Sequence, residues 1–178
     1  IVFDVKCSSR LTDFIKKMKG RPIMGATGHS LIRDRMIKES ALLGGELSGH
    51  IFFSDDYYGF DDAIYTAARL VSYLSKSKET LSDFREKIPK SVSTPEIRIP
   101  CNEEKKFDVV NQLKSIFNKD YKTNEIDGIR ISFTGGWALI RASNTEPALV
   151  LRFEAQDKDL LSRYEKIVHQ ILLKKGIE

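Results

Sequence analysis

The 178-residue sequence contains only two cysteines and no long apolar run. Cys7 and Cys101 lie far apart, and neither has a second cysteine or a histidine at the spacing of a metal site. No segment approaches the roughly 20 apolar residues that cross a bilayer, and no secretory signal opens the chain. We therefore expect a cytoplasmic protein with two reduced thiols, no membrane partner and no metal ligands in this chain.

The sequence also lacks a strong charge imbalance. The formal net charge is +4 and the pI is near 9.0, but the excess is spread thinly, and the densest basic run, residues 16–21, ends a predicted helix, where cations are common. With 41% hydrophobic and 30% charged residues, the composition is that of a globular protein. We expect no nucleic-acid partner, whereas the rival hypothesis, a basic nucleic-acid-binding protein, predicts strongly salt-dependent binding to DNA or RNA.

The sequence has no initiator methionine and begins inside a predicted strand. Residues 1–5 are four apolar residues and one aspartate, without a turn signal before them. We therefore expect the chain to be a fragment of a longer protein.

The first half of the sequence alternates strands and helices. Strands are predicted over residues 1–5, 21–26 and 51–53, and apolar residues at helical spacing predict helices near residues 10–19, 31–41, 62–74 and 80–88. This alternation favours an α/β fold with a mainly parallel sheet, here a truncated domain of the three-layer type. Residues 44–50 contain three glycines, which fit neither a helix nor a central strand, so a loop is expected there.

The second half follows a different pattern after a predicted linker at residues 90–95. Strands are predicted over residues 96–101, 128–134, 137–142 and 148–155, with helices over 104–117 and 160–173. Phe107, Val110, Leu113 and Phe117 form the apolar face of the first of these helices. The pattern predicts an α+β domain with a four-stranded antiparallel sheet and two helices. We place the domains at residues 1–92 and 93–178.

The glycine-rich loop at residues 45–50 carries three polar side chains that suit a sugar. Glu46 offers two acceptor oxygens for neighbouring hydroxyls, Ser48 lies two residues on, and His50 can exchange a proton near neutral pH. The alternative is a polar surface turn.

A second polar loop, residues 141–147, connects two predicted strands. Arg141, Ser143, Asn144 and Thr145 supply a guanidinium, two hydroxyls, an amide and nearby backbone N–H groups, a combination suited to phosphate. Glu146 fits such a loop only if its carboxylate points away. The alternative is an asparagine-centred turn with an exposed arginine.

Two further candidates lie where open α/β sheets place ligand-binding groups. Lys6 follows the first predicted strand, and His29 lies in the turn before a helix. Taken singly, such residues are more often structural or solvated.

Together these segments resemble the α-D-phosphohexomutase superfamily, in its phosphomannomutase/phosphoglucomutase branch. The matching motifs run in the family's order over nearly the whole chain. Asn144 favours this branch over the phosphoglucosamine mutases, which usually have glycine there. The motifs are Asp4-Val5-Lys6-Cys7, Thr27-Gly28-His29-Ser30, Gly45-Glu46-Leu47-Ser48-Gly49-His50, Gly59-Phe60-Asp61-Asp62, Ser93-Thr94-Pro95-Glu96 and Arg141-Ala142-Ser143-Asn144-Thr145.

The resemblance implies a four-domain enzyme, of which this chain would hold part of the third, sugar-recognition domain and the whole fourth, phosphate-binding domain. By this resemblance, a phosphoserine and an aspartate-bound Mg²⁺ would lie in N-terminal domains outside this chain, against which it would pack. The full enzyme would interconvert mannose or glucose 1- and 6-phosphates through a bisphosphorylated sugar. The chain alone would be inactive. Alternatives are a non-catalytic phosphosugar-binding module and a phosphoglucosamine mutase fragment.

The resemblance also implies roles for individual residues. Glu46 and Ser48 would bind the 3- and 4-hydroxyls, and Lys6, His29 and His50 would line the cleft, with His50 a candidate general acid or base. The substrate's non-reacting phosphate would be held by Arg141, Ser143, Asn144 and Thr145.

Overall fold

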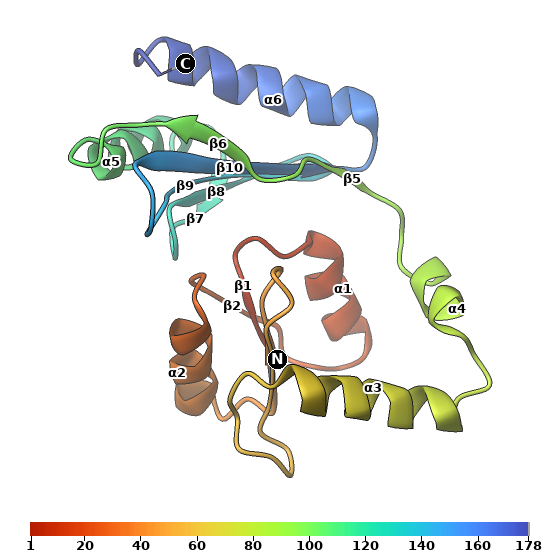
Figure 1. Cartoon of the computed structure of the whole chain (residues 1–178). Helices are drawn as coiled ribbons and strands as arrows, with labels where there is room; N and C mark the ends of the chain where they lie inside the picture. Colours follow the sequence, from red (N-terminus) through yellow and green to blue (C-terminus); the bar gives the residue numbers. More distant parts are fainter. Residues whose placement is uncertain (178) are drawn as a thin grey trace. The chain divides into compact units, whose positions relative to one another are not determined.

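The computed structural model describes residues 1–177, which form two compact units (Figure 1). The N-terminal unit comprises Ile1–Pro89 and the C-terminal unit Lys90–Glu178. This division lies three residues before the boundary expected from the sequence. Among the described residues, no helix is both long and apolar enough to span a bilayer.

The N-terminal unit contains a four-stranded sheet in the order β2-β1-β3-β4. β1 pairs in parallel with β2 and with β3, and only β4 runs antiparallel, to β3. The mainly parallel α/β sheet predicted from the sequence is therefore confirmed. The strands are β1 (Val2–Asp4), β2 (Ile23–Gly25), β3 (Leu43–Gly45) and β4 (Ile51–Phe53).

Helices cover both faces of this sheet. Val2 packs with α2 (His29–Glu39), and the next residue, Phe3, packs with α1 (Ser9–Lys17), because successive strand side chains point to opposite faces. Figure 1 shows the two helices on either side of β1 and β2. α3 (Ala63–Lys76) contacts β4, and the short α4 (Leu81–Glu86) follows it.

The strand β3 corrects the expectation of a loop at Gly44 and Gly45. A Cβ on Gly44 would overlap the Sδ atom of Met36 and lie 3.1 Å from the Cγ2 atom of Ile32. Glycine therefore lets α2 lie close against an interior strand, a packing reason that outweighs its poor strand propensity.

The C-terminal unit contains a six-stranded antiparallel sheet rather than the four-stranded one predicted. The two additional strands are β5 and β7. β5 pairs with β10 inside the predicted linker, and β7 consists of polar residues that carry no apolar alternation. The elements are β5 (Val92–Ser93), β6 (Ile97–Pro100), α5 (Lys106–Phe117), β7 (Lys122–Asn124), β8 (Ile129–Phe133), β9 (Gly136–Ala142), β10 (Ala148–Ala155) and α6 (Lys158–Leu173).

Both helices of this unit pack on one face of its sheet. Val110, Leu113 and Phe117 of α5 share a single core with the inward-facing residues of β8, β9 and β10 and with α6. Phe107, expected on the apolar face of α5, is 55% exposed, whereas Lys106 is 1% exposed. The predicted face is therefore confirmed at Val110, Leu113 and Phe117, but in the first turn the interior position belongs to a lysine rather than to Phe107.

Candidate functional site

Three of the candidate residues follow the three parallel strands of the N-terminal unit. Lys6 follows β1, His29 follows β2 and Glu46 directly follows β3. Because parallel strands end at a common edge, these residues share the carboxyl edge of the sheet, where open α/β folds bind ligands. We call this group, with Ser48 and His50, the edge cluster.

Glu46 connects two loops of the edge cluster. Its side chain is only 8% exposed, and its Oε1 atom accepts a 2.7 Å hydrogen bond from the N–H group of Gly28. The loop closes through hydrogen bonds from the Glu46 N–H to the His50 carbonyl and from the Gly49 N–H to the Glu46 carbonyl. Ser48 is exposed at the tip. Oε1 therefore holds the two loops together, and the other carboxylate oxygen, Oε2, keeps its two lone pairs for hydroxyl donors.

His50 is oriented by a residue to which the sequence assigned no role. Its Nδ1 atom lies 2.5 Å from Oδ2 of Asp61, and Oδ1 of Asp61 accepts a 3.3 Å bond from the N–H group of Ile51. Because an ionised carboxylate only accepts hydrogen bonds, Nδ1 carries the proton and Nε2 is left for a ligand. The His29 ring centroid lies 6.2 Å from that of His50.

The neighbouring Asp62 is structural. It caps α3 by accepting the N–H of Tyr65 at 2.8 Å, and it accepts the Tyr57 hydroxyl at 2.6 Å. The second bond raises the pKa of Tyr57 to about 12 and lowers the pKa of Asp62. The two consecutive aspartates thus have separate functions: Asp61 orients His50 of the edge cluster, and Asp62 caps α3.

Lys6 is held by a fully buried aspartate. Oδ1 of Asp4 accepts the Lys6 N–H at 3.1 Å and the Cys7 thiol at 3.2 Å, and the Lys6 ammonium lies 3.9 Å from Oδ2. The Lys6 side chain is 11% exposed. Asp4 therefore fixes both the turn after β1 and the cation at the edge.

In the C-terminal unit, the loop between β9 and β10 is built around Ser143. Its Oγ atom accepts hydrogen bonds from the N–H groups of Thr145 and Glu146 at 3.3 and 3.2 Å. Ser143 is 5% exposed, whereas Asn144 and Thr145 are exposed. The hydroxyl predicted to bind phosphate thus organises the loop, and it can donate only its single proton outward.

Arg141 is fixed by Asp127, which sequence reasoning missed. Its Nε atom donates to Oδ2 of Asp127 at 3.0 Å, and the two side chains are 8% and 15% exposed. The Nη2 atom of Arg141 is buried and has no hydrogen-bond partner among the described residues. An unsatisfied buried donor of this kind costs about 1–3 kcal/mol, which an anionic ligand could recover.

A close approach of two backbone segments brings Asp127 to Arg141. Gly128 has φ +75°, and a Cβ there would overlap the carbonyl oxygen of Ile140 and lie 2.7 Å from the Cα atom of Arg141. Glycine is therefore required at this position both for its conformation and for its size.

Glu146 points away from the loop that contains it. Its Oε2 atom accepts a 3.0 Å hydrogen bond from the Nε atom of Arg98 on β6, and Arg98 also contacts Glu96 at 3.4 Å. The carboxylate is therefore paired with a cation on β6, the strand that pairs with β10, which partly offsets the charge of Glu146 beside the loop.

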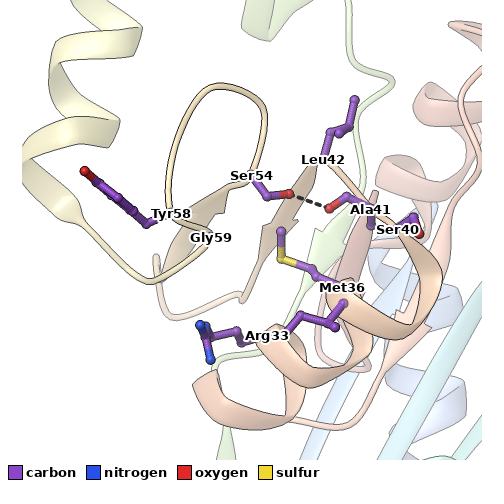
Figure 2. Close-up of a pocket in the computed structure, with 9 residues that line it drawn as sticks. Arg33, Met36, Ser40, Ala41, Leu42, Ser54, Tyr58 and Gly59 are labelled. Carbon is purple, nitrogen blue, oxygen red and sulfur yellow. Dashed lines mark hydrogen bonds between the residues drawn. The ribbon is translucent and has the colours of Figure 1, made fainter.

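The N-terminal unit has a pocket of about 250 Å³, and Figure 2 shows residues that line it. It is lined by α2 from Arg33 onward, by the segment between α2 and β3, and by the loop after β4. In that loop, the Ser54 hydroxyl donates to the Ala41 carbonyl at 2.7 Å. No candidate site residue lines it. Within residues 1–177, no group of three or more His, Cys, Asp or Glu side chains could hold a metal ion.

Comparisons with known proteins match both units. The family descriptions are "Phosphoglucomutase/phosphomannomutase, alpha/beta/alpha domain III", over residues 1–92, and "Phosphoglucomutase/phosphomannomutase, C-terminal domain", over residues 96–171. A phosphomannomutase/phosphoglucomutase of Pseudomonas syringae is 49% identical over 98% of this chain, and a phosphoglucomutase of Neisseria gonorrhoeae is 42% identical over 93%. A crystal structure of a family protein from Burkholderia thailandensis matches 99% of the chain with a TM-score of 0.89 and 36% identity. The chain spans 36–38% of the length of these proteins.

Proposed function

The chain belongs to the phosphoglucomutase/phosphomannomutase family, and we propose that it supplies the sugar- and phosphate-binding parts of an enzyme that interconverts hexose 1-phosphates and 6-phosphates. The reaction would pass through a bisphosphorylated sugar, so the same residues must hold the sugar in two orientations. The observation that carries this proposal is the edge cluster, in which residues from the ends of three parallel strands converge and Gly28 binds Glu46.

In this proposal the edge cluster binds the sugar ring. The carboxylate of Glu46 and the hydroxyl of Ser48 take the 3- and 4-hydroxyls, which occupy similar places in both orientations. Lys6 and His29 line the same edge. The bond from Gly28 supports this role because it fixes one carboxylate oxygen and thereby aims the other.

His50 is proposed to move a proton at its Nε2 atom. The contact between Nδ1 and Asp61 supports this role because it sets the tautomer and restrains the ring. A histidine held in this way can protonate the leaving oxygen of one half-reaction and accept the proton in the other. Asp61 is then a positioning residue rather than a catalytic one.

The C-terminal unit is proposed to hold the phosphate that does not react. Arg141, pinned by Asp127 with its Nη2 atom unsatisfied, provides the cation. Ser143, Asn144 and Thr145 provide hydroxyl, amide and backbone donors. Because this phosphate is a spectator, the loop should contribute equally to ground-state and transition-state binding.

Phosphoryl transfer itself would require a serine nucleophile and Mg²⁺ held by other domains of a longer protein, against which this chain would pack. The residues described here do not fit a Mg²⁺ site, since no cluster of candidate ligands exists among them. We therefore propose that the metal is bound outside residues 1–177, in the cytoplasmic enzyme.

Ligand titration followed by NMR tests the proposal on the chain itself. Glucose 1-phosphate should shift amide signals of residues 45–50 and 143–146, whereas inorganic phosphate should shift only the second set. Arg141→Gln should abolish the phosphate response, and Lys119→Gln, which removes an exposed cation of the same unit, should not. Turnover of glucose 1-phosphate by the purified chain, free of host mutase, or responses confined to other residues, would contradict the proposed roles.

A further inference from the structure

Lys106 is a buried lysine to which neither the family motifs nor the proposed mechanism gives a role. It lies at the start of α5 and is 1% exposed. Its ammonium donates to the carbonyl oxygens of Ser143 and Glu146 at 2.7 and 3.2 Å and lies 2.6 Å from a carboxylate oxygen of Glu103. A lysine ammonium has three protons, and these three partners account for all of them.

Burying an ammonium is costly unless each donor is satisfied, so the interior position of Lys106 depends on all three of these partners. Two of its three partners are backbone carbonyls of the β9–β10 loop. They lie 37 and 40 residues away in the sequence. Lys106 therefore restrains the conformation of this loop by binding the loop's backbone, not its side chains.

The planar trans peptide determines what this contact does. In such a unit the C=O and the following N–H point in opposite directions. Because the Ser143 carbonyl points at Lys106, the N–H of Asn144 points away from it. That N–H donates no hydrogen bond within residues 1–177, whereas the next two N–H groups both donate to Ser143 Oγ.

We propose that Lys106 is a positioning residue for anion binding, which anchors the Ser143–Asn144 peptide so that the Asn144 N–H is presented to the phosphate of the sugar ligand. This inference rests on the proposed function of the loop. It adds the Asn144 N–H as a phosphate donor and Lys106 as the residue that positions it. The bond to Lys106 also polarises the peptide and makes its N–H a stronger donor. The second anchor, the Glu146 carbonyl, also accepts the Ala148 N–H at 2.8 Å and closes the loop at its far end.

Three variants of the chain separate this role from a contribution to stability alone. Lys106→Met keeps the length and apolar stem of the side chain but removes all three donors, and Lys106→Arg retains charge and donors. Glu103→Gln removes only the negative charge at the third partner, leaving both loop contacts. A fourth variant, Val168→Ala, opens the core of the same unit on α6, where Val168 is fully buried, without touching the loop.

The readouts are the dissociation constant for glucose 1-phosphate and the amide order parameters and ligand-induced shifts of residues 143–146. Lys106→Met should weaken binding by about 10-fold, the equivalent of losing one charge-assisted contact. It should also lower the order parameters of residues 143–146 and diminish the shift of the Asn144 amide. Lys106→Arg should recover part of both effects, and Glu103→Gln and Val168→Ala should bind like wild type.

Wild-type affinity and wild-type loop order in a folded Lys106→Met variant would overturn the inference. Equal weakening in Val168→Ala would also overturn it, since general destabilisation would then explain the loss. If the wild-type chain binds neither glucose 1-phosphate nor inorganic phosphate, the proposed function fails. In that case, the order parameters of Lys106→Met still decide whether this lysine shapes the loop.

Discussion

Replacing Gly128 by alanine should destabilise the C-terminal unit through two separable effects. Holding a non-glycine residue at φ +75° costs about 1–2 kcal/mol. The added methyl group would also overlap the Ile140 carbonyl oxygen and crowd the Cα of Arg141. Both neighbours are backbone atoms, which cannot rotate away as a side chain can, so overpacking adds about 1–3 kcal/mol.

Gly176 offers a matched control within the same unit. Its φ is +70°, and a Cβ there would have no heavy atom within 4 Å. Gly176→Ala should therefore show the conformational cost alone. The difference between the two variants isolates the close approach that brings Asp127 to Arg141.

Urea unfolding followed by tryptophan fluorescence measures both variants. Trp137, the single tryptophan of the chain, is 3% exposed in the C-terminal unit. The guanidinium carbon of Arg130 lies 3.7 Å from its ring centroid, so unfolding will change its environment. Gly128→Ala should lose about 2–5 kcal/mol in total and should bind inorganic phosphate more weakly. A loss no greater than that of Gly176→Ala would refute the reasoning.

Three further predictions concern function, folding and ionisation. In a full-length enzyme, Arg141→Ala should raise KM roughly 10- to 150-fold, since a charge-assisted contact of about 1.5–3 kcal/mol is lost equally in the ground state and the transition state. Glu46→Ala should instead lower kcat, because the sugar would be misaligned for reaction. An unchanged kcat in Glu46→Ala would show that the sugar binds elsewhere. Residues 90–178 should unfold cooperatively on their own, and at a higher temperature than residues 94–178, which lack β5. Equal midpoints in thermal melts of the two segments would show that β5 does not contribute to stability. In an alkaline spectrophotometric titration one tyrosine should ionise near pH 12, because the neutral phenol of Tyr57 keeps its hydrogen bond to the Asp62 carboxylate until its pKa is exceeded. Tyr57→Phe should abolish that step. If the step persists in the variant, it belongs to another tyrosine.

Local patterns were sufficient for the fold class and for the positions of both candidate loops, except that the first loop was expected to include Gly44 and Gly45, which belong to β3. Elements with strong periodicity or an apolar run, such as α6 and β10, were predicted close to their observed bounds. β5 and β7 were missed because each is two or three residues long and largely polar. Their existence depends on hydrogen bonds to a neighbouring strand, which no local signal encodes.

The supporting residues of the site were less accessible from the sequence. Asp61 lies 11 residues from His50, Asp127 lies 14 from Arg141, and Lys106 lies 37 from Ser143. The two members of each pair lie in different elements or loops, so no helix or strand period brings them together. Asp61 is part of one of the family motifs and could have been considered as a partner of His50. Lys106 gave no such signal, because a lysine is ordinarily expected at the surface.

The long sequence separation of the anchors around the β9–β10 loop has a consequence for how the unit folds. Lys106, Arg98 and Asp127 reach the loop across 37, 48 and 14 residues. Contacts of such high order form only after the distant segments have met, so the loop acquires its shape late in folding. A ligand that recognises that shape binds the native state and not the nascent chain. At a free concentration 100 times its dissociation constant, such a ligand would stabilise the native state against unfolding by about 2.7 kcal/mol. If this loop binds a sugar phosphate as proposed, the concentration of that ligand would also affect how long the protein persists before it is degraded, independently of any effect on a reaction rate.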